Sequence, residues 1–118
     1  MATDQGDHER AKLLLEEGLA LSRRIGDKRV IARTLGALGI MAAYQSDYSR
    51  ATTLLSECLE LRRALGDKHG IASITAALGG VATFQGDYSR AEALFNESLK
   101  FGRSIDDNPL RPRLWSWE

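Results

Sequence analysis

Apolar residues recur along this chain every three or four positions, the spacing that places side chains on one face of an α-helix. Three stretches, 7–25, 48–65 and 88–105, share one order of apolar residues. The shared positions are Ala11, Leu14, Leu15 and Leu19, then Ala51, Leu54, Leu55 and Leu59, then Ala91, Leu94, Phe95 and Leu99. Charged residues fall off these stripes, so we expect three amphipathic helices.

Two further stretches between them have the same helical spacing. Residues 28–45 and 68–85 carry apolar residues at matching places, which include Ile31, Leu35, Leu38 and Ala42, then Ile71, Leu78 and Ala82. No run alternates apolar and β-branched residues with polar ones, and no Asn-Gly turn occurs, so no β-strand is predicted. The pattern therefore predicts an all-α chain with five main helices.

Short motifs between these stretches return every 40 residues. One motif reads GDHERA at 6–11, SDYSRA at 46–51 and GDYSRA at 86–91, and a second reads IGDK at 25–28 and LGDK at 65–68. We expect the glycine to end one helix in the left-handed conformation and the aspartate to cap the next. Such short loops make neighbouring helices antiparallel. Repetition at this period indicates a stacked solenoid.

The identities within each repeat point to a known family. One repeat supplies Leu35, Leu38, Gly39, Ala42, Ser46, Ala51, Leu55 and Cys58, and the next supplies Thr75, Leu78, Gly79, Ala82, Gly86, Ala91, Phe95 and Ser98. Over residues 6–105 the chain resembles the tetratricopeptide repeat family in its 40-residue form. Ser46 departs from the usual turn glycine, and Leu35 and Thr75 depart from the usual large aromatic residue. The resemblance implies a right-handed superhelical solenoid of antiparallel helix pairs, with about two and a half repeats.

Repeats of this length with Gly-Asp turns resemble those of large bacterial signal-transduction ATPases, bacterial transcriptional activators and animal polarity adaptors. The resemblance implies a non-catalytic protein–protein interaction module, which acts as a scaffold in a bacterial regulatory or signalling protein. The chain carries no Gly-x-x-x-x-Gly-Lys-[Ser/Thr] motif for binding nucleotide. We therefore expect either a fragment of a larger regulator or a short free-standing repeat protein.

Composition narrows the choice of partner. The 118 residues include 16 basic and 16 acidic side chains, so the formal net charge is zero. Nucleic acid is not predicted as a partner, because its phosphates require a basic face. The sequence has no apolar segment long enough for a membrane span and no secretory signal. Its single cysteine, Cys58, fits a reducing compartment. We expect a cytoplasmic protein with no membrane partner.

Few residues suggest chemistry. His8 and His69 are far apart in the sequence and have no histidine or cysteine near them, so no metal site is predicted. Cys58 occupies a small-residue position of the 48–65 stripe and is expected in the core, without a partner base. We therefore predict no catalytic residue and no cofactor, and an enzyme is the least favoured class.

The helices do not form complete pairs at the ends of the chain. We divide it into an N-terminal tail (1–5), a solenoid (6–105) and a C-terminal tail or truncated helix of the next repeat (106–118). Stacked repeats cannot bury their faces alone. An alternative function is therefore self-assembly into dimers or higher oligomers, head to tail or by helix-pair exchange at 66–70. The expected contact residues are Leu14, Leu15, Leu110, Leu114, Trp115 and Trp117.

The resemblance also implies where a partner binds, because the first helix of each repeat lines the concave face. The residues expected there are Arg33, Gly36, Ala37, Ile40, Ala43 and Tyr44, then Ser73, Ala76, Ala77, Gly80, Thr83 and Phe84. Tyr44 and Phe84 are expected to anchor a partner helix or an extended peptide, or alternatively to pack on the adjacent repeat. Ala37 and Ala77 replace the asparagines with which some family members grip a C-terminal carboxylate. A third hypothesis is sensing of a peptide or small ligand in this groove.

Overall fold

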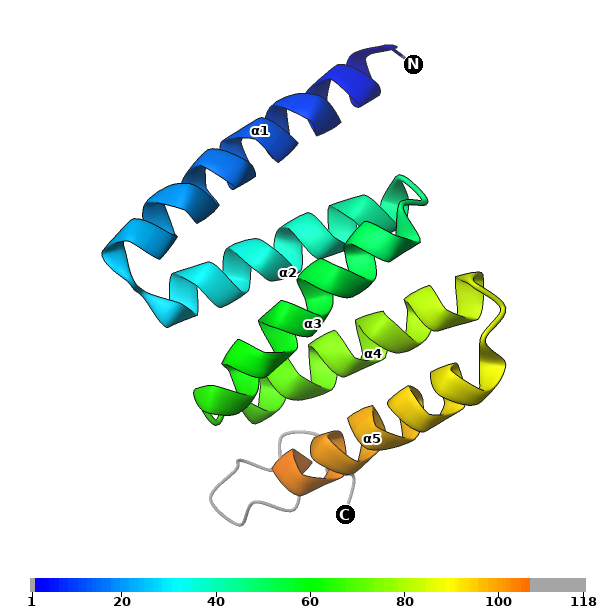
Figure 1. Ribbon diagram of the computed structural model, residues 1–118. Helices are drawn as coiled ribbons and strands as arrows, with labels where there is room; N and C mark the ends of the chain where they lie inside the picture. The colour runs from blue at the N-terminus through cyan, green and yellow to red at the C-terminus, as the bar shows by residue number, and fades with distance from the viewer. Residues whose placement is uncertain (1, 107–118) are drawn as a thin grey trace, which may run out of the picture.

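The computed structural model describes the backbone of residues 2–106 and the side chains of residues 6–104. Over this range the chain forms five α-helices and no β-strand: α1 (Ala2–Ile25), α2 (Lys28–Tyr44), α3 (Tyr48–Ala64), α4 (Lys68–Phe84) and α5 (Tyr88–Asp106). Figure 1 shows the helices stacked in chain order, with α1 and α5 at opposite ends. The prediction of an all-α chain built from packed helix pairs is confirmed.

Each helix packs on its neighbours in the chain. The most extensive contacts join α2 to α3 and α4 to α5, while α1 packs on α2 and α3 packs on α4. The helices α2 and α4 also contact each other directly, and we call them the inner helices. We call α1, α3 and α5 the outer helices. Two complete pairs, α2–α3 and α4–α5, thus follow a single outer helix, α1.

The turns between helices follow the predicted chemistry. At each of the four turns, the residue before the aspartate adopts positive φ, with values of 82° at Gly26, 64° at Ser46, 66° at Gly66 and 80° at Gly86. The next residue is always an aspartate that caps the following helix. For example, Asp67 Oδ1 accepts a hydrogen bond from the backbone N–H of Gly70 at 3.0 Å. The expected glycine ends and aspartate caps are confirmed at these turns, and Ser46 takes the strained conformation without being glycine.

The first helix differs from the prediction at its start. Helix α1 begins at Ala2, five residues before the expected start at residue 7, so Asp7 lies inside the helix and is not a cap. In the later repeats the turn glycine or serine reverses the chain after a preceding helix. At Gly6 the chain does not reverse, and α1 runs without a break from Ala2 through Gly6.

The core lies where the two complete pairs meet. Its largest fully buried side chains are Leu35, Leu55, Cys58 and Thr75. The glycines on the inner helices allow close approach: a Cβ built on Gly39 would lie 2.7 Å from Leu55 Cγ. The Cys58 thiol donates a hydrogen bond to the carbonyl oxygen of Ala32 at 3.1 Å, which also joins α3 to α2. The small-residue positions of the sequence therefore set how closely each pair packs.

Ion pairs connect the outer helices across the stack. The three pairs are Arg23 Nη2 to Glu57 Oε2 at 2.6 Å, Arg50 Nη2 to Glu16 Oε1 at 2.8 Å, and Arg63 Nη2 to Glu97 Oε1 at 2.6 Å. Every one of these side chains is more than a third exposed. Exposed pairs each contribute about 0.2–1 kcal/mol at most. They matter here mainly because they recur with the repeat, and we refer to them as the outer ladder.

Candidate partner-binding groove

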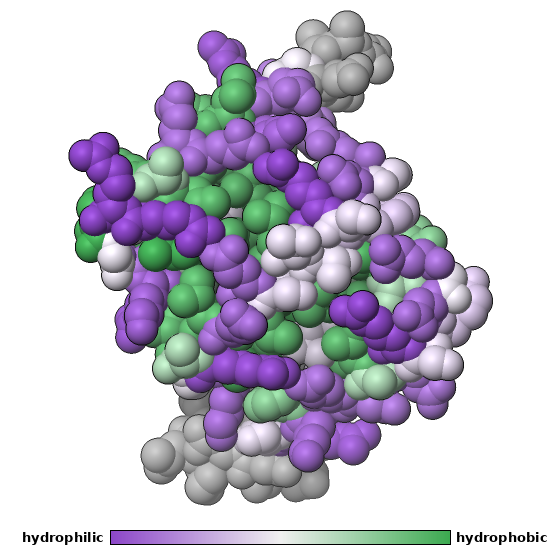
Figure 2. All heavy atoms as spheres, viewed as in Figure 1, coloured by the Kyte–Doolittle hydropathy of each residue, from purple (hydrophilic) through white to green (hydrophobic). Residues whose placement is uncertain are grey.

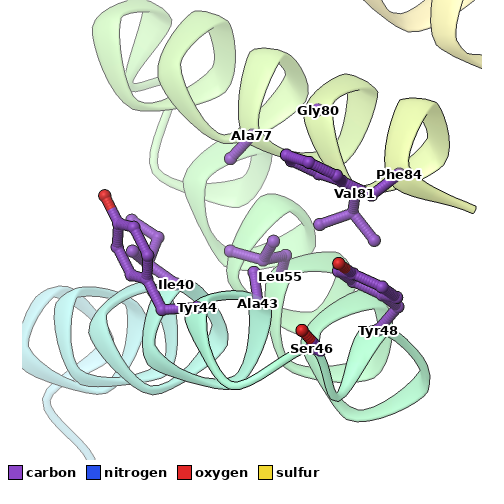
Figure 3. Close-up of a pocket in the computed structure, with 10 residues that line it drawn as sticks. All are labelled: Ile40, Ala43, Tyr44, Ser46, Tyr48, Leu55, Ala77, Gly80, Val81 and Phe84. Carbon is purple, nitrogen blue, oxygen red and sulfur yellow. The ribbon is translucent and has the colours of Figure 1, made fainter.

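An apolar groove lies between the two inner helices. It has a volume of about 410 Å³ and is lined by Ile40, Ala43, Tyr44, Ser46, Tyr48, Leu55, Ala77, Gly80, Val81 and Phe84. Figure 3 shows α2 on one side, α4 on the other, and Leu55 of α3 between them. None of the lining residues carries a charge. The groove is therefore suited to apolar and aromatic groups, with the tyrosine hydroxyls as polar contacts.

Aromatic side chains form the rim of this groove. Phe84, at the end of α4, stacks on Tyr48 at the start of α3, with ring centroids 5.8 Å apart and ring planes inclined by 2°. Figure 3 shows Tyr44 on the other side of the opening. Tyr44 is 80% exposed and Phe84 is 73% exposed. Phe84 therefore packs on the adjacent repeat through one face and remains largely exposed, as Tyr44 does, and exposed aromatic side chains at the edge of a groove are a residue type that anchors protein interfaces.

Small residues on the inner helices keep the groove open. Ala77 and Gly80 face the space from α4, one turn apart, and Ala43 faces it from α2. A Cβ built on Gly80 meets no atom within 4 Å. A larger residue at Gly80 would therefore enter the groove without disturbing the helix packing.

The structure brings together half of the twelve residues expected on this surface. Ile40, Tyr44, Ala77, Gly80 and Phe84, together with Ala43, line the groove as a group. Arg33 and Ser73 are exposed and Ala37 is half-buried, and none of the three lines the groove. Gly36 was expected to face the partner, and this expectation was wrong. It is buried, and a Cβ there would lie 3.4 Å from Cys58 Sγ. The glycine in the middle of α2 thus allows α3 to pack closely on α2.

Sequence reasoning missed Tyr48 as a groove residue. It begins an outer helix, whereas only the inner helices were expected to contribute. The signal was available in the antiparallel order, since the end of each inner helix and the start of each outer helix lie at the same edge of the stack. Tyr48 and Phe84 meet at that edge, and the groove is closed there by a residue from each type of helix.

Cys58 belongs to the core, as expected, and not to the groove. It is fully buried, and burial raises the pKa of its thiol above the ordinary value even though the guanidinium of Arg62 opposes this effect. A raised pKa keeps the thiol protonated near neutral pH, where only a thiolate is an effective nucleophile. The equivalent Ser98 makes the equivalent bond, from its hydroxyl to the carbonyl oxygen of Ala72 at 2.7 Å. The thiol therefore acts as a packing and hydrogen-bonding group.

Comparison with protein families agrees with this architecture. The sequence profile of the tetratricopeptide repeat matches residues 1–64 and, in a second overlapping alignment, residues 31–104. The chain belongs to the tetratricopeptide repeat family. Tetratricopeptide repeats are generally protein–protein interaction modules and are typically non-catalytic. The comparison with curated proteins gives no match.

Among solved structures, this tetratricopeptide repeat chain is similar to the crystal structure of BtubC (BKLC) from P. vanneervenii. The TM-score is 0.81 at 22% sequence identity, and the match covers 97% of this chain. It covers 47% of the BtubC chain, so the present chain spans about half of that protein. At this identity the likeness establishes the fold alone.

Within the described range, no helix is both long and apolar enough to cross a membrane.

Proposed function

We propose that this tetratricopeptide repeat chain is a non-catalytic interaction module that binds a partner protein in the groove between α2 and α4. The partner segment presents a large apolar or aromatic side chain, carried on a helix or an extended peptide. The observation that supports this proposal is the uncharged groove between two exposed aromatic residues, Tyr44 and Phe84. Burial of such rings at an interface removes apolar surface from water and stabilises the complex.

The absence of charge within the groove limits the class of partner. A phosphorylated or acidic motif would need arginine or lysine at the contact, and no lining residue is charged. The same observation supports the earlier argument from Ala37 and Ala77 against capture of a C-terminal carboxylate. We further propose, from the sequence resemblance, that the chain serves as a scaffold in a cytoplasmic bacterial regulator.

Filling the groove tests this proposal. Peptides selected from a display library against the chain would be titrated calorimetrically into Gly80→Leu and into a matched control, Gly6→Leu. Both glycines are helical, and a Cβ at either meets no atom within 4 Å. We expect selected peptides to carry an aromatic or large aliphatic anchor and to bind Gly80→Leu at least about ten-fold more weakly, the effect of losing one buried anchor. Equal affinity for both variants would place the binding site elsewhere.

We propose self-association through the ends as a second candidate function. Leu14 is 64% exposed and Leu21 is 55% exposed on α1, whereas the equivalent residues of α3 and α5 are half-buried. Leu15 is half-buried, and Leu110, Leu114, Trp115 and Trp117 lie outside the described residues. Light scattering after size exclusion, across a range of concentrations, tests this candidate. A mass that stays at the 13.0 kDa of one chain would reject it, and a mass unchanged by deletion of 107–118 would exclude the tail from the contact.

Two other hypotheses from the sequence stay predictions. Helix-pair exchange at 66–70 would produce a dimer that does not grow further with concentration. Sensing of a small ligand in the groove would appear as an increase in the melting temperature when that ligand is added.

A further inference from the structure

A second hollow lies toward the start of the inner helices, away from the groove. It has a volume of about 380 Å³ and is lined by Arg29, Arg62, Leu65 and Asp67, and we call it the arginine hollow. The groove has no charged lining residue, whereas three of the four residues here are charged. Two guanidinium groups against one carboxylate give the arginine hollow one excess positive charge near neutral pH.

The arginine hollow and the groove lie along the same faces of two helices. On α3, Tyr48, Leu55 and Arg62 follow one another at intervals of seven residues, close to two turns, so their side chains leave the same face. Tyr48 and Leu55 line the groove, and Arg62 lines the arginine hollow. On α2, Ala43 lines the groove and Arg29, nearly four turns away, lines the arginine hollow. At 1.5 Å per residue, these spacings place the two sites about 10–20 Å apart along one surface.

The two arginines of this hollow depart from the 40-residue repeat. Each arginine of the outer ladder has arginine at the equivalent positions of the other repeats, as expected of residues that hold the stack together. By contrast, the equivalents of Arg62 are Ser22 and Gly102, and the equivalent of Arg29 is His69. Figure 2 shows hydrophilic side chains across the visible face of the molecule, so an exposed arginine alone does not mark a site. Two departures that meet in one hollow are instead a local feature of this part of the chain.

Gly70 is a third departure, and it makes room for Arg62. A Cβ built on Gly70 would lie 2.6 Å from Arg62 Cδ, and the equivalent residue one repeat earlier is Val30. Arg62 Nη1 donates a hydrogen bond to Asp67 Oδ2 at 2.9 Å, while Asp67 Oδ1 accepts one from the backbone N–H of Gly70 at 3.0 Å. The Arg62 side chain is only 21% exposed. Its guanidinium group is therefore held in place before any ligand arrives, which reduces the entropy lost on binding.

Arg29 completes the arginine hollow from the other side, on α2. Its side chain is exposed and takes part in none of the ion pairs found among residues 6–104. The one acidic residue of the hollow, Asp67, is already engaged by Arg62 and by the cap of α4. An incoming carboxylate would thus meet Arg29 without a competing acid. Arginine binds carboxylates through charge-assisted hydrogen bonds, which are stronger than those between neutral groups.

We propose that the arginine hollow binds the side-chain carboxylate of an aspartate or glutamate in the same partner segment whose apolar anchor lies in the groove. This inference rests on the function proposed above and adds a second contact, its chemistry and its spacing. One carboxylate balances the excess charge of the hollow. A separation of about 10–20 Å corresponds to about three to six residues of an extended peptide, or about seven to fourteen of a helix. Because the two contacts differ in chemistry, they also fix the direction in which the segment lies.

Peptide selection tests this spacing. The probe is a display library of randomised peptides of about 16 residues, long enough to reach both sites whether extended or helical. Selected peptides are synthesised with amidated C-termini, so that their only carboxylates are side chains. We expect an aspartate or glutamate at a constant distance from the apolar anchor. Its replacement by asparagine or glutamine should weaken binding about two- to ten-fold in calorimetric titration, and added salt should weaken binding of the original peptide.

Variants of the chain locate the carboxylate. Arg29→Gln and Arg62→Gln should each weaken binding of the acidic peptide about two- to ten-fold. Arg24→Gln is the matched control, because Arg24 is also exposed, departs from the repeat and makes no ion pair within the described range, but lines neither site. The loss must also be shared: against Arg29→Gln, the acidic and amide forms of the peptide should bind nearly equally. A purely structural role of Arg62 in the α3–α4 turn would not produce this coupling.

The outcomes separate the arginine hollow from the groove. If Gly80→Leu weakens binding but the selected peptides share no acidic residue, or Arg29→Gln binds them like the unaltered chain, the groove stands and the arginine hollow is overturned. Losses from the peptide acid and from Arg29→Gln that simply add, without coupling, overturn it as well. If Gly80→Leu has no effect, the groove fails, and the two-site arrangement fails with it. A library that yields no binding peptide overturns both.

Discussion

The pairs α2–α3 and α4–α5 follow one 40-residue register, yet their equivalent positions behave differently. Leu59 is 9% exposed and Leu99 is 56% exposed, although both are leucines at the same place in an outer helix. Tyr48 is half-buried against Phe84, whereas the equivalent Tyr88 is 69% exposed. Leu59 and Tyr48 both belong to α3, which is followed along the stack by the pair α4–α5. Burial in this fold is therefore set by neighbours along the stack as much as by residue type.

Other differences between the pairs come from substitutions within the register. Leu55 fills the space beside Gly39 in the first pair, and the larger Phe95 lies beside Gly79 in the second. Phe95 remains 40% exposed, whereas Leu55 is fully buried. The first pair is thus a closed contact and the second is an open one. Matched substitutions at equivalent positions should show this difference as unequal losses of stability.

Truncation of the side chain at the outer-helix position should give the largest effect. Leu55→Ala leaves a cavity in the closed pair, and we expect it to reduce the free energy of unfolding by about 3–4 kcal/mol. Phe95→Ala removes a larger side chain, but one already partly in water, and should cost about half as much. Urea denaturation followed by circular dichroism measures both. Equal losses would mean that the two pairs are equally closed in solution.

Addition of a methyl group at the inner-helix glycines should give the next largest effect. In Gly39→Ala the new Cβ would lie 2.7 Å from Cγ of the buried Leu55. We expect a loss of about 1–3 kcal/mol from overpacking. In Gly79→Ala the nearest atoms are those of the Phe95 ring at 3.1 Å, and this ring can move outward. The higher helix propensity of alanine, worth up to about 1 kcal/mol, should then leave that variant near the original stability.

The inner helices differ at one fully buried position, Leu35 in α2 and Thr75 in α4. Thr75 Oγ1 is buried and has no hydrogen-bond partner among the described residues. Thr75→Val removes this hydroxyl without changing the shape of the side chain, and should raise the free energy of unfolding by about 1–2 kcal/mol. Thr34→Val is the control, because Thr34 Oγ1 donates to the carbonyl oxygen of Val30 at 2.8 Å. The control should gain nothing, and a gain of the same size would refute the explanation.

The comparison of the two pairs also shows how much of the structure can be predicted from the sequence. Periodicity and turn motifs predicted five helices and their antiparallel order, because both depend on residues close in the chain. The groove was only partly predictable: Tyr44 and Phe84 could be assigned from the register, but the stacking of Phe84 on Tyr48 depends on the angle between helix pairs. The early start of α1 was missed because the motif at Gly6 was assumed to act as it does after a preceding helix.

The turns provide the smallest and most local contrast between the pairs. Ser46 has φ of 64° and the equivalent Gly86 has φ of 80°, so only the first pair places a side chain in the left-handed region. Ser46→Gly removes that strain, which should raise the free energy of unfolding by about 1–2 kcal/mol. It also gives the unfolded chain more conformational freedom, which reduces this gain by about 0.4–1 kcal/mol. We expect a net gain of roughly 0.5–1 kcal/mol, and a similar loss for Gly86→Ser. The two changes together should nearly cancel in the melting temperature, since the turns lie at different pairs and share no contact. If Ser46→Gly destabilises the chain instead, the serine side chain stabilises its own turn, and the two pairs differ in how each helix reversal is held.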